Sequence, residues 1–383
     1  MRIVVSRLFS QAITSKQRRA ANRSLHSLPR RWLSKPAIVH YFHDLTDPYS
    51  KLLATLLPKL VERYQIDLRC HRVLPPDAAA APDIARLKEW SQRDAARLAA
   101  HFAIEPDRNE SSSLAFMTQD PARGSQLRDR LGHYLGATLY FEGEWYWGLD
   151  RLHYLEQRLQ QAGLARKPDN RFLCPPPPLQ LTAQQPGTEP RVLNFYCSLR
   201  SPYTYLAAER IKQLTEHYAL DLRLRFVLPM VMRGLPVPFV KRKYILLDCK
   251  READRLGLPF GNVADPVGEP VENGLAILHA AIKLGRGAEF LLAFLRGVFV
   301  EGLDASRRDT LRLFCVRAGL DEEILQSALT DDNWRTIAAD NRQQLLKLGL
   351  WGVPSFQLEG YPAVWGQDRL WMIEQDLLST HTS

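Results

Sequence analysis

The sequence predicts an α/β protein with two related domains in tandem, each running β-α-β, a helical insert and then β-β-α. The chain has 383 residues, and at roughly 150 residues per domain this length suits two or three domains. A proline-rich stretch interrupts it near residues 165–190, and motifs before that stretch recur after it in the same order. Hydrophobic residues make up 45% and charged residues 24%, which is typical of globular proteins and excludes wholesale disorder.

The recurring motifs keep a regular spacing. Thr-Asp-Pro-Tyr-Ser at residues 46–50 matches Arg-Ser-Pro-Tyr-Thr at 200–204, 154 positions later. Trp-Gly-Leu-Asp-Arg-Leu at 147–152 matches Trp-Gly-Gln-Asp-Arg-Leu at 365–370, 218 positions later. Matches at both ends, in the same order, indicate an internal repeat. The two offsets differ by 64 residues, so we expect about that many extra residues in the middle of the second copy.

The repeat and the proline-rich stretch divide the chain into four parts. Residues 1–36 are a basic segment that we expect to be flexible. Residues 37–165 hold the first domain and residues 191–383 the second. Residues 166–190 include four consecutive prolines, which cannot maintain helix or sheet hydrogen bonds, so we expect a stiff, extended linker there.

The second block shows the clearest order of elements. Residues 192–197 are apolar and aromatic, which predicts a short buried strand. Pro202 then suits the first turn of a helix, because a helix tolerates proline there. Residues 220–227 predict a second strand, parallel to the first because a helix separates them.

The rest of the second block completes the pattern. Residues 240–348 are almost wholly helical in their apolar spacing, and two short strands, 355–358 and 363–365, surround a turn before a last helix. Two parallel strands followed by a hairpin, with helices on both faces, resemble the thioredoxin architecture. The large helical insert is typical of its DsbA-like branch. The first block follows the same plan with a much shorter insert.

The net charge of +9 belongs to one segment. Residues 1–36 contain nine Lys and Arg and no Asp or Glu, so the remaining chain has 42 basic against 42 acidic residues. The folded part is therefore not expected to bind nucleic acid specifically. Three interpretations of the basic segment stay open: a mitochondrial transit peptide, a basic helix resting on anionic lipid or RNA, and a solvated extension.

The sequence predicts no transmembrane segment. No stretch approaches the ~18 consecutive apolar residues of a membrane-spanning helix. The basic segment also lacks the apolar core of a secretory signal. We therefore expect a cytoplasmic protein, with a mitochondrial location as the alternative if the basic segment is a transit peptide.

Cysteine and histidine usage excludes several kinds of site. The five cysteines contain no CxxC pair, which rules out a disulfide-stapled scaffold and a cysteine-rich metal site. Cys197 lies inside the first strand of the second block, where we expect it to be buried. His40 and His43 are three apart on a strand and face opposite sides, so no metal site is expected.

Two segments of the second block can carry chemistry. Ser201 precedes Pro202 where the first strand ends and the helix begins, and the free N–H groups of a helix N-terminus stabilise an anion. With no cysteine at this position, the Ser201 hydroxyl can instead donate a hydrogen bond to a thiolate that a ligand supplies. Pro354 enters the third strand, so the Val353–Pro354 bond is a candidate for a cis peptide, and the backbone of Val353 can pair with an extended peptide.

These residues together resemble the 2-hydroxychromene-2-carboxylate isomerases and the kappa-class glutathione transferases. The matches are Ser-Pro-Tyr-Thr-Tyr-Leu at 201–206, Gly-Val-Pro at 352–354 and Gly-Gln-Asp-Arg at 366–369, in the family's order. The resemblance implies that glutathione is the cofactor and Ser201 the catalytic residue that stabilises its thiolate. The residues implied to hold glutathione are Pro202, Tyr203, Val353, Pro354, Gln367 and Asp368.

The resemblance implies a glutathione-dependent isomerase or transferase acting on a small aromatic or otherwise conjugated electrophile. In the isomerases the glutathione sulfur adds to a conjugated double bond, allows rotation and leaves; in the transferases it stays on the product. The alternative is a relative of the DsbA-like disulfide oxidoreductases that lacks redox cysteines and serves as a non-catalytic thioredoxin-like binding module. A homodimer stays an open alternative.

The sequence departs from the family pattern at several positions. Residues 230–238 contain no Asn where the family often has one that reaches glutathione, and Arg200 precedes the serine where a small or apolar residue is usual. In the first block Asp47 occupies the serine position, and a carboxylate would repel a thiolate. Gly-Ala-Thr at 136–138 replaces Gly-Val-Pro, so the proline is missing. We therefore interpret the first block as a degenerate copy.

Overall fold

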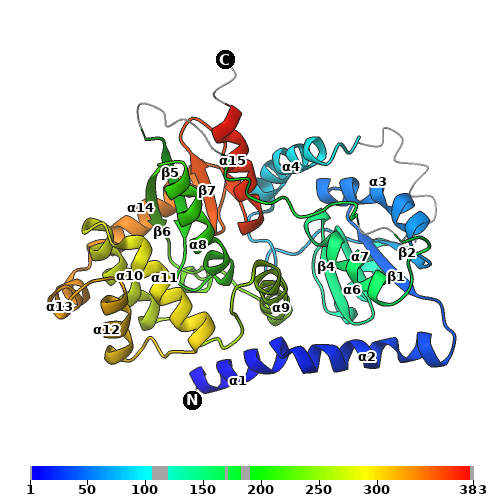
Figure 1. Cartoon of the computed structure of the whole chain (residues 1–383), viewed down its shortest axis with the longest axis horizontal. Coiled ribbons are helices and arrows are strands. Elements are labelled where there is room, and N and C mark those ends of the chain that lie inside the picture. Colours follow the sequence, from blue (N-terminus) through cyan, green and yellow to red (C-terminus); the bar gives the residue numbers. More distant parts are fainter. Residues whose placement is uncertain (1, 106–119, 169–170, 183–189, 380–383) are drawn as a thin grey trace. The chain divides into compact units, whose positions relative to one another are not determined.

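The computed structural model describes residues 2–105, 120–168, 171–182 and 190–379. The chain forms two compact units, each built on its own four-stranded sheet (Figure 1). The C-terminal unit comprises Met1–Ser15, Pro178–Val237 and Arg242–Ser383, and the N-terminal unit comprises Lys16–Pro177 and Pro238–Lys241. The chain is therefore a mixed α/β protein, as predicted, and the two units divide it in an interleaved way.

The sheet of the C-terminal unit has the strand order β6-β5-β7-β8. The central strand β5 pairs in parallel with β6 and antiparallel with β7. Helix α8 (Pro202–His217) connects β5 to β6, which explains why these two strands run in the same direction. The strands are β5 (Val192–Cys197), β6 (Asp221–Phe226), β7 (Ser355–Leu358) and β8 (Val364–Trp365).

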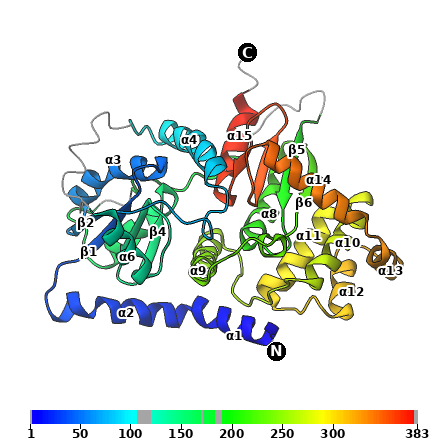
Figure 2. The ribbon, with the colours of Figure 1, turned by 180° about the vertical axis from the view of Figure 1, so that it is seen from behind.

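A long helical segment separates β6 from β7, as the sequence predicted. Helix α14 ends this segment and covers the face of the sheet opposite α8 (Figures 1 and 2). Asn341 on α14 donates to the carbonyl of Phe226 at 3.0 Å, which joins the insert to the end of β6. The helices are η2 (Met230–Arg233), α9 (Phe239–Leu256), α10 (Glu269–Lys283), α11 (Gly287–Arg296), η3 (Gly297–Glu301), α12 (Arg308–Arg317), α13 (Glu322–Thr330) and α14 (Asn333–Lys347), and η4 (Gln367–Arg369) and α15 (Leu370–Ser379) follow the sheet.

The N-terminal unit contains a sheet with the corresponding strand order, β2-β1-β3-β4. Its register also corresponds, since Ile38 faces Asp67 across the parallel pair as Val192 faces Asp221, both 154 positions later. The elements are β1 (Ile38–His43), α3 (Pro48–Arg63), β2 (Asp67–Arg72), α4 (Ile84–His101), α6 (Pro121–Leu131), β3 (Thr138–Phe141), β4 (Glu144–Trp147), η1 (Leu149–Arg151) and α7 (Leu152–Gln161).

A repeated glutamate on the last helix of each unit holds the proline-rich stretch. Glu374 on α15 accepts the backbone N–H groups of Gln180 and Leu181, both at 2.6 Å. Glu156 on α7 accepts the backbone N–H of Leu173 at 2.8 Å. Both glutamates are buried, at 2% and 0% exposure. A segment with few internal hydrogen bonds is thus fixed by buried carboxylates at equivalent places.

The basic N-terminal segment, expected to be flexible, forms two helices that are bonded to the protein. In α1 (Arg2–Thr14), Ser6 donates to the carbonyl of Val263 at 2.8 Å and Ser10 accepts the N–H of Val263 at 2.9 Å, within the C-terminal unit. In α2 (Lys16–Trp32), Arg23 and Arg30 bond to glutamates of the N-terminal unit. Within the described residues, no helix is long and apolar enough to span a bilayer.

We predict that Glu374→Gln destabilises the C-terminal unit by about 1–3 kcal/mol, because one of two buried backbone donors would then face an NH2 group instead of an acceptor. The free energy of unfolding in urea measures the effect. Glu323→Gln, at an exposed position of α13, is the matched control. Equal stability of the two variants would show that the linker is not held by this carboxylate.

Candidate functional site

The corner between β5 and α8 places Ser201 next to Val353. Ser201 is the N-cap of α8, with extended backbone (φ −96°, ψ 113°) and Pro202 in the first turn. Its Oγ accepts the N–H of Thr204 at 3.2 Å and lies 3.5 Å from the carbonyl oxygen of Val353, to which it donates. Two residues that are 152 positions apart in the sequence are therefore brought together at the N-terminus of a helix.

The segment before β7 has the predicted backbone. The Val353–Pro354 peptide bond is cis. Gly352 has no room for a side chain, because the indole ring of Trp365 occupies the space where a Cβ would lie. The carbonyl of Pro354 accepts the N–H of Gly366 at 2.9 Å, and Ser355 Oγ donates to the carbonyl of Gly352 at 2.8 Å. These bonds fix the backbone of Gly352 and Pro354 at the start of β7.

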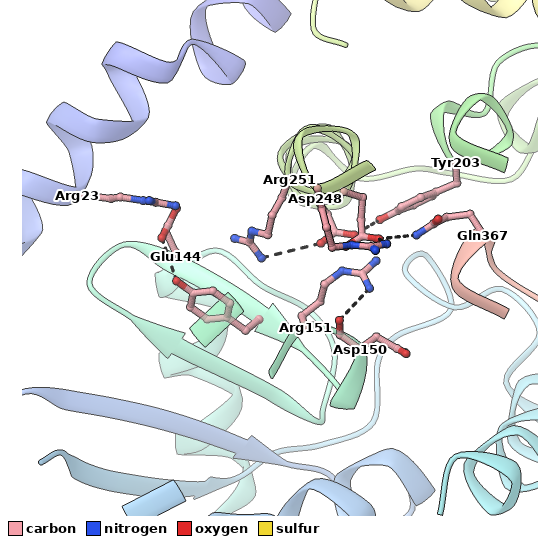
Figure 3. A network of polar contacts seen from close by, with 11 residues as sticks. Arg23, Glu144, Asp150, Arg151, Tyr203, Asp248, Arg251 and Gln367 are labelled. Atoms are coloured by element: carbon pink, nitrogen blue, oxygen red, sulfur yellow. Dashed lines mark hydrogen bonds and ion pairs between the residues drawn. The ribbon is translucent and has the colours of Figure 1, made fainter. Parts of the chain in front are cut away.

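Tyr203 points away from this corner toward α9. Its hydroxyl donates to Asp248 Oδ2 at 2.8 Å (Figure 3), and Asp248 is only 2% exposed. The sequence placed Tyr203 among the cofactor-binding residues, and the structure gives it a buried carboxylate as partner. This bond connects the first turn of α8 to α9.

Gln367 is buried, with 1% of its surface exposed, and both ends of its amide are bonded. Its Nε2 donates to Glu252 at 2.8 Å (Figure 3), and its Oε1 accepts from Arg210 Nη1 at 2.8 Å. Glu252 also pairs with Arg255 at 2.8 Å. Burial lowers the pKa of Arg210, and the charge of Arg255 adds to this, whereas Glu252 and Asp368 act in the opposite direction.

Sequence reasoning missed Arg210, Asp248 and Glu252, although all three contact or surround predicted site residues. Arg210 lies on α8, so the helical pattern could have placed it two turns beyond Pro202. Asp248 and Glu252 lie one turn apart on α9, and nothing in their spacing signals which neighbour they face.

Arg233 provides a second unpredicted feature close to the corner. Its Nη2 lies 3.5 Å from the carbonyl oxygen of Trp351, two residues before Val353. Its Nε is buried and has no hydrogen-bond partner among the described residues. Burial, together with the nearby positive charge of Arg342, lowers the pKa of Arg233 to about 10. A half-buried guanidinium in this setting favours an anion.

Arg200, which departs from the family pattern, is held away from Ser201 by a carboxylate. Its guanidinium makes two hydrogen bonds to Asp265, Nε to Oδ1 at 2.6 Å and Nη2 to Oδ2 at 2.7 Å. This fork-to-fork geometry fixes the side chain. Arg200 is therefore committed to the loop that follows α9.

No thiol is available at the corner. None of the five cysteines forms a disulfide, all five are buried, and burial raises the pKa of Cys197 inside β5. A buried neutral thiol is a poor nucleophile. His40 bonds to His71 at 3.0 Å, while His43 bonds to the hydroxyl of Tyr41 at 2.9 Å. Throughout the described ranges, no three His, Cys, Asp or Glu side chains gather as metal ligands would.

The equivalent corner of the N-terminal unit is filled by its own side chains. Asp47 caps α3 by accepting the N–H groups of Tyr49 and Ser50, at 3.2 and 3.1 Å. Ser50 Oγ donates to Asp47 at 2.9 Å and accepts the N–H of Ala137 at 2.8 Å. Burial raises the pKa of Asp47 to about 6, and the negative charge of Asp44 contributes to the rise.

The sheet register corrects one detail of the sequence comparison. Thr138 pairs with Phe42, and the residue equivalent to Phe42, Tyr196, pairs with Ser355. Ala137 therefore occupies the position of Pro354, one residue earlier than the motif alignment placed it. Its N–H donates to Ser50, a bond that proline could not make.

Comparisons with known proteins match the second half of the chain. Residues 192–378 match the family model of the DSBA-like thioredoxin domain. The 2-hydroxychromene-2-carboxylate isomerases of Pseudomonas sp. (strain C18) and Pseudomonas putida are each 24% identical over 191 residues, which cover 48% of this chain and 88% and 92% of theirs.

Solved structures also match about half of the chain. A 2-hydroxychromene-2-carboxylate isomerase has a TM-score of 0.43 and 21% identity, covering 49% of this chain and 95% of that chain. The cytosolic disulfide reductase DsbM from Pseudomonas aeruginosa has a TM-score of 0.40 and 25% identity, covering 49% and 98%.

We predict that Asp47→Ser changes stability in a pH-dependent way. A folded-state pKa of about 6 lies above the ordinary value of 3.8, so the folded protein binds this proton more tightly than the unfolded chain does. The contribution of Asp47 to the free energy of unfolding is therefore fully present below about pH 4 and is lost as the pH rises through 6. The variant keeps the cap without the charge. On going from pH 4.5 to pH 7.5, the free energy of unfolding of the variant should therefore increase relative to that of the wild type, by at most about 3 kcal/mol.

Unfolding free energies at both pH values measure this difference. The same substitution at Asp321, an exposed N-cap of α13, controls for the loss of a capping carboxylate. A variant whose stability relative to the wild type is independent of pH would contradict the prediction.

Proposed function

We propose that this chain, whose residues 192–378 belong to the DsbA-like thioredoxin family, is a glutathione-dependent isomerase or transferase acting on a small conjugated electrophile. The observation that carries the proposal is the Ser201 hydroxyl. It stands at the N-terminus of α8, 3.5 Å from the carbonyl of Val353, at a corner that contains no cysteine. The two curated relatives, both named as isomerases, support the same activity class.

Ser201 would stabilise the thiolate of glutathione. A thiol with a pKa of ~8.5 is only a few per cent ionised at pH 7, and lowering the pKa by about two units requires about 2.7 kcal/mol. A hydroxyl bond to the anion and the positive end of α8 can together provide this. The bond from Ser201 to Val353 is long, at 3.5 Å, so redirecting the hydroxyl toward sulfur costs little.

The reaction needs no redox group. Bound glutathione would supply a thiolate nucleophile for addition to a conjugated carbon. It would be regenerated in an isomerase and would stay on the product as a thioether in a transferase. Ser201 stabilises sulfur as the attacking and the leaving thiolate.

The other predicted residues would position the tripeptide. The backbone of Val353, beside Pro354, would pair with the cysteinyl residue as an added strand. Asp368 would receive the ammonium of the γ-glutamyl end. Because Gln367 is bonded at both ends of its amide, we assign it the task of holding η4 in place through Arg210 and Glu252. Tyr203 would hold α9 against the start of α8.

Arg233 would bind a ligand carboxylate. Its anchor, the Trp351 carbonyl, is two residues from Val353, a separation of at most about 7 Å between Cα atoms. A thiolate at Ser201 and a carboxylate at Arg233 could therefore belong to one bound assembly. The carboxylate could be the glycyl end of glutathione or part of the electrophile, and the curated relatives are named for a carboxylate substrate.

The N-terminal unit would be a degenerate thioredoxin-like copy without this activity. Its strand order and register correspond to those of the C-terminal unit. Asp47 replaces the serine, and Ser50 already occupies the corner by bonding to Asp47 and Ala137. A second glutathione site is therefore not proposed there.

We predict that Ser201→Ala raises the pKa of protein-bound glutathione by at least about one unit, because the only hydroxyl proposed to bond the sulfur is removed. The thiolate absorbance of the complex, followed against pH, measures this. Ser201→Thr retains both the hydroxyl and the cap and should preserve the low pKa. Absence of glutathione binding at millimolar concentration, or an unchanged thiol pKa in the alanine variant, would favour a non-catalytic binding module instead.

We also predict that Arg233→Gln weakens binding of the carboxylate ligand about ten-fold or more, since a charge-assisted bond is lost, while Arg233→Lys retains part of the affinity. Calorimetry with glutathione and with its glycine amide tests whether the carboxylate is the glycyl end of glutathione. Calorimetry with paired electrophiles, with and without a carboxylate, tests whether it belongs to the electrophile. Arg317→Gln removes one cation from α12 and is the control. An Arg233→Gln variant that behaves like this control in both assays would exclude the role.

A further inference from the structure

Helix α2 carries a continuous apolar face that is exposed. Ala21, Leu25, Leu28 and Trp32 follow the spacing i, i+4, i+7 and i+11, which places them on one side of a helix. Leu25 is 63% exposed, Leu28 39% and Trp32 79%. We call these four residues the apolar stripe. Leu33, directly after the helix, is 66% exposed and extends it.

The opposite face of α2 is the one bonded to the N-terminal unit. Arg23 donates to Glu144 at 2.9 and 3.0 Å (Figure 3), and Arg30 donates to Glu142 at 2.7 Å. Both glutamates flank the turn of the β3–β4 hairpin. The imidazole of His26 packs against Gly143 in that turn, where a Cβ would lie 2.5 Å from the ring. These contacts fix the rotation of the helix and leave the apolar stripe on the outer side.

The charge around the apolar stripe has a single sign. Residues 16–36 contain seven Lys and Arg and no Asp or Glu. Arg23 and Arg30 are used by the hairpin glutamates, whereas Arg31 and Lys35 are exposed beside the stripe. The surface is therefore an apolar ridge with cationic flanks. The complementary partner has an apolar interior beneath an anionic surface.

Helix α1 shows the same division of faces within the C-terminal unit. Ser6 and Ser10 bond to the backbone of Val263. Val4, Val5 and Leu8 are 57%, 60% and 62% exposed. Both helices therefore use polar side chains for these attachments and expose several of their aliphatic side chains, whereas an ordinary surface helix buries its apolar face.

Two other kinds of partner, a second copy of α2 and RNA, fit the apolar stripe and its cations less well. A second copy of α2 would bring seven more cations, with no acidic residue, against the first seven. RNA would be bound by the cations, but three exposed aliphatic side chains in a row would contribute little to it. A bilayer accommodates both features, because aliphatic side chains insert at the acyl boundary, Trp lies at the headgroup level and cations meet anionic lipid.

We propose that the apolar stripe of α2 binds the surface of an anionic membrane, with the helix lying in the plane of the interface. The attachment is peripheral, and it does not depend on the proposed glutathione site. It places the enzyme at a surface where apolar, conjugated molecules concentrate.

Co-sedimentation of the full-length chain with vesicles tests the proposal. Vesicles of phosphatidylcholine with one quarter phosphatidylglycerol should bind the protein, and vesicles of phosphatidylcholine alone should bind it at least ten-fold more weakly. Binding should weaken as salt rises. Leu25→Ser/Leu28→Ser should lower the partition coefficient at least ten-fold, without changing the melting temperature, because both side chains are exposed in the folded protein.

A matched control is available on α12. Leu313→Ser/Val316→Ser has the same spacing and comparable exposure, at 38% and 65%, and should bind vesicles as the wild type does. Failure to bind anionic vesicles, or equal loss in both double variants, would overturn the proposal. Conversion of a dimer to a monomer by the α2 variant would identify a second copy as the partner. Binding of an RNA oligonucleotide, without vesicle binding, would identify nucleic acid.

Discussion

The hydroxyl of Ser201 lies beside the carbonyl of Val353 at the N-terminus of α8, and the proposed chemistry depends on the position of this hydroxyl. It requires β5 to end at Cys197, α8 to start at Pro202 and the cis peptide at Pro354 to lie beside them. Each condition has a local cause. Proline starts the helix, serine caps it, and Gly352 leaves the space that Trp365 fills. A hydroxyl in this position can stabilise an anion that the protein itself does not carry.

The two units show what a single substitution does at equivalent positions. Ser201 and Asp47 both cap the helix that follows the first strand, so the fold is satisfied by either. Their chemistry differs, because a carboxylate repels a thiolate and recruits Ser50 to share its negative charge. The same architecture therefore places a hydroxyl at the corner of one unit and a carboxylate bonded to a neighbouring serine at the corner of the other.

Much of the fold could be predicted because it rests on local patterns. Strand β5, the parallel pairing with β6 and the long helical insert follow from apolar spacing and from the repeat at 154 residues. Glu156 and Glu374 are also 218 residues apart, but this spacing does not reveal their role as acceptors for the linker backbone. The register at Ala137 was missed by one residue, since a motif without its proline has no fixed anchor.

Other parts depend on contacts between distant segments, which a single sequence does not reveal. Asp248 and Glu252, which bond to Tyr203 and Gln367, lie on α9, whose rotation is set by packing. Arg233 could be recognised as a candidate site residue only from its position beside the carbonyl of Trp351. The basic segment was expected to be flexible because composition alone does not show that its arginines bond to Glu142 and Glu144 at a hairpin turn. Composition predicted its charge, and the fold determined which face is exposed.

A crystal structure of the complex with glutathione tests the central claim most directly. We predict that the sulfur atom lies within about 3.5 Å of Ser201 Oγ and that the cysteinyl backbone of the tripeptide pairs with Val353. A tripeptide bound elsewhere, or a sulfur atom whose nearest polar neighbour is a group other than this hydroxyl, would contradict it.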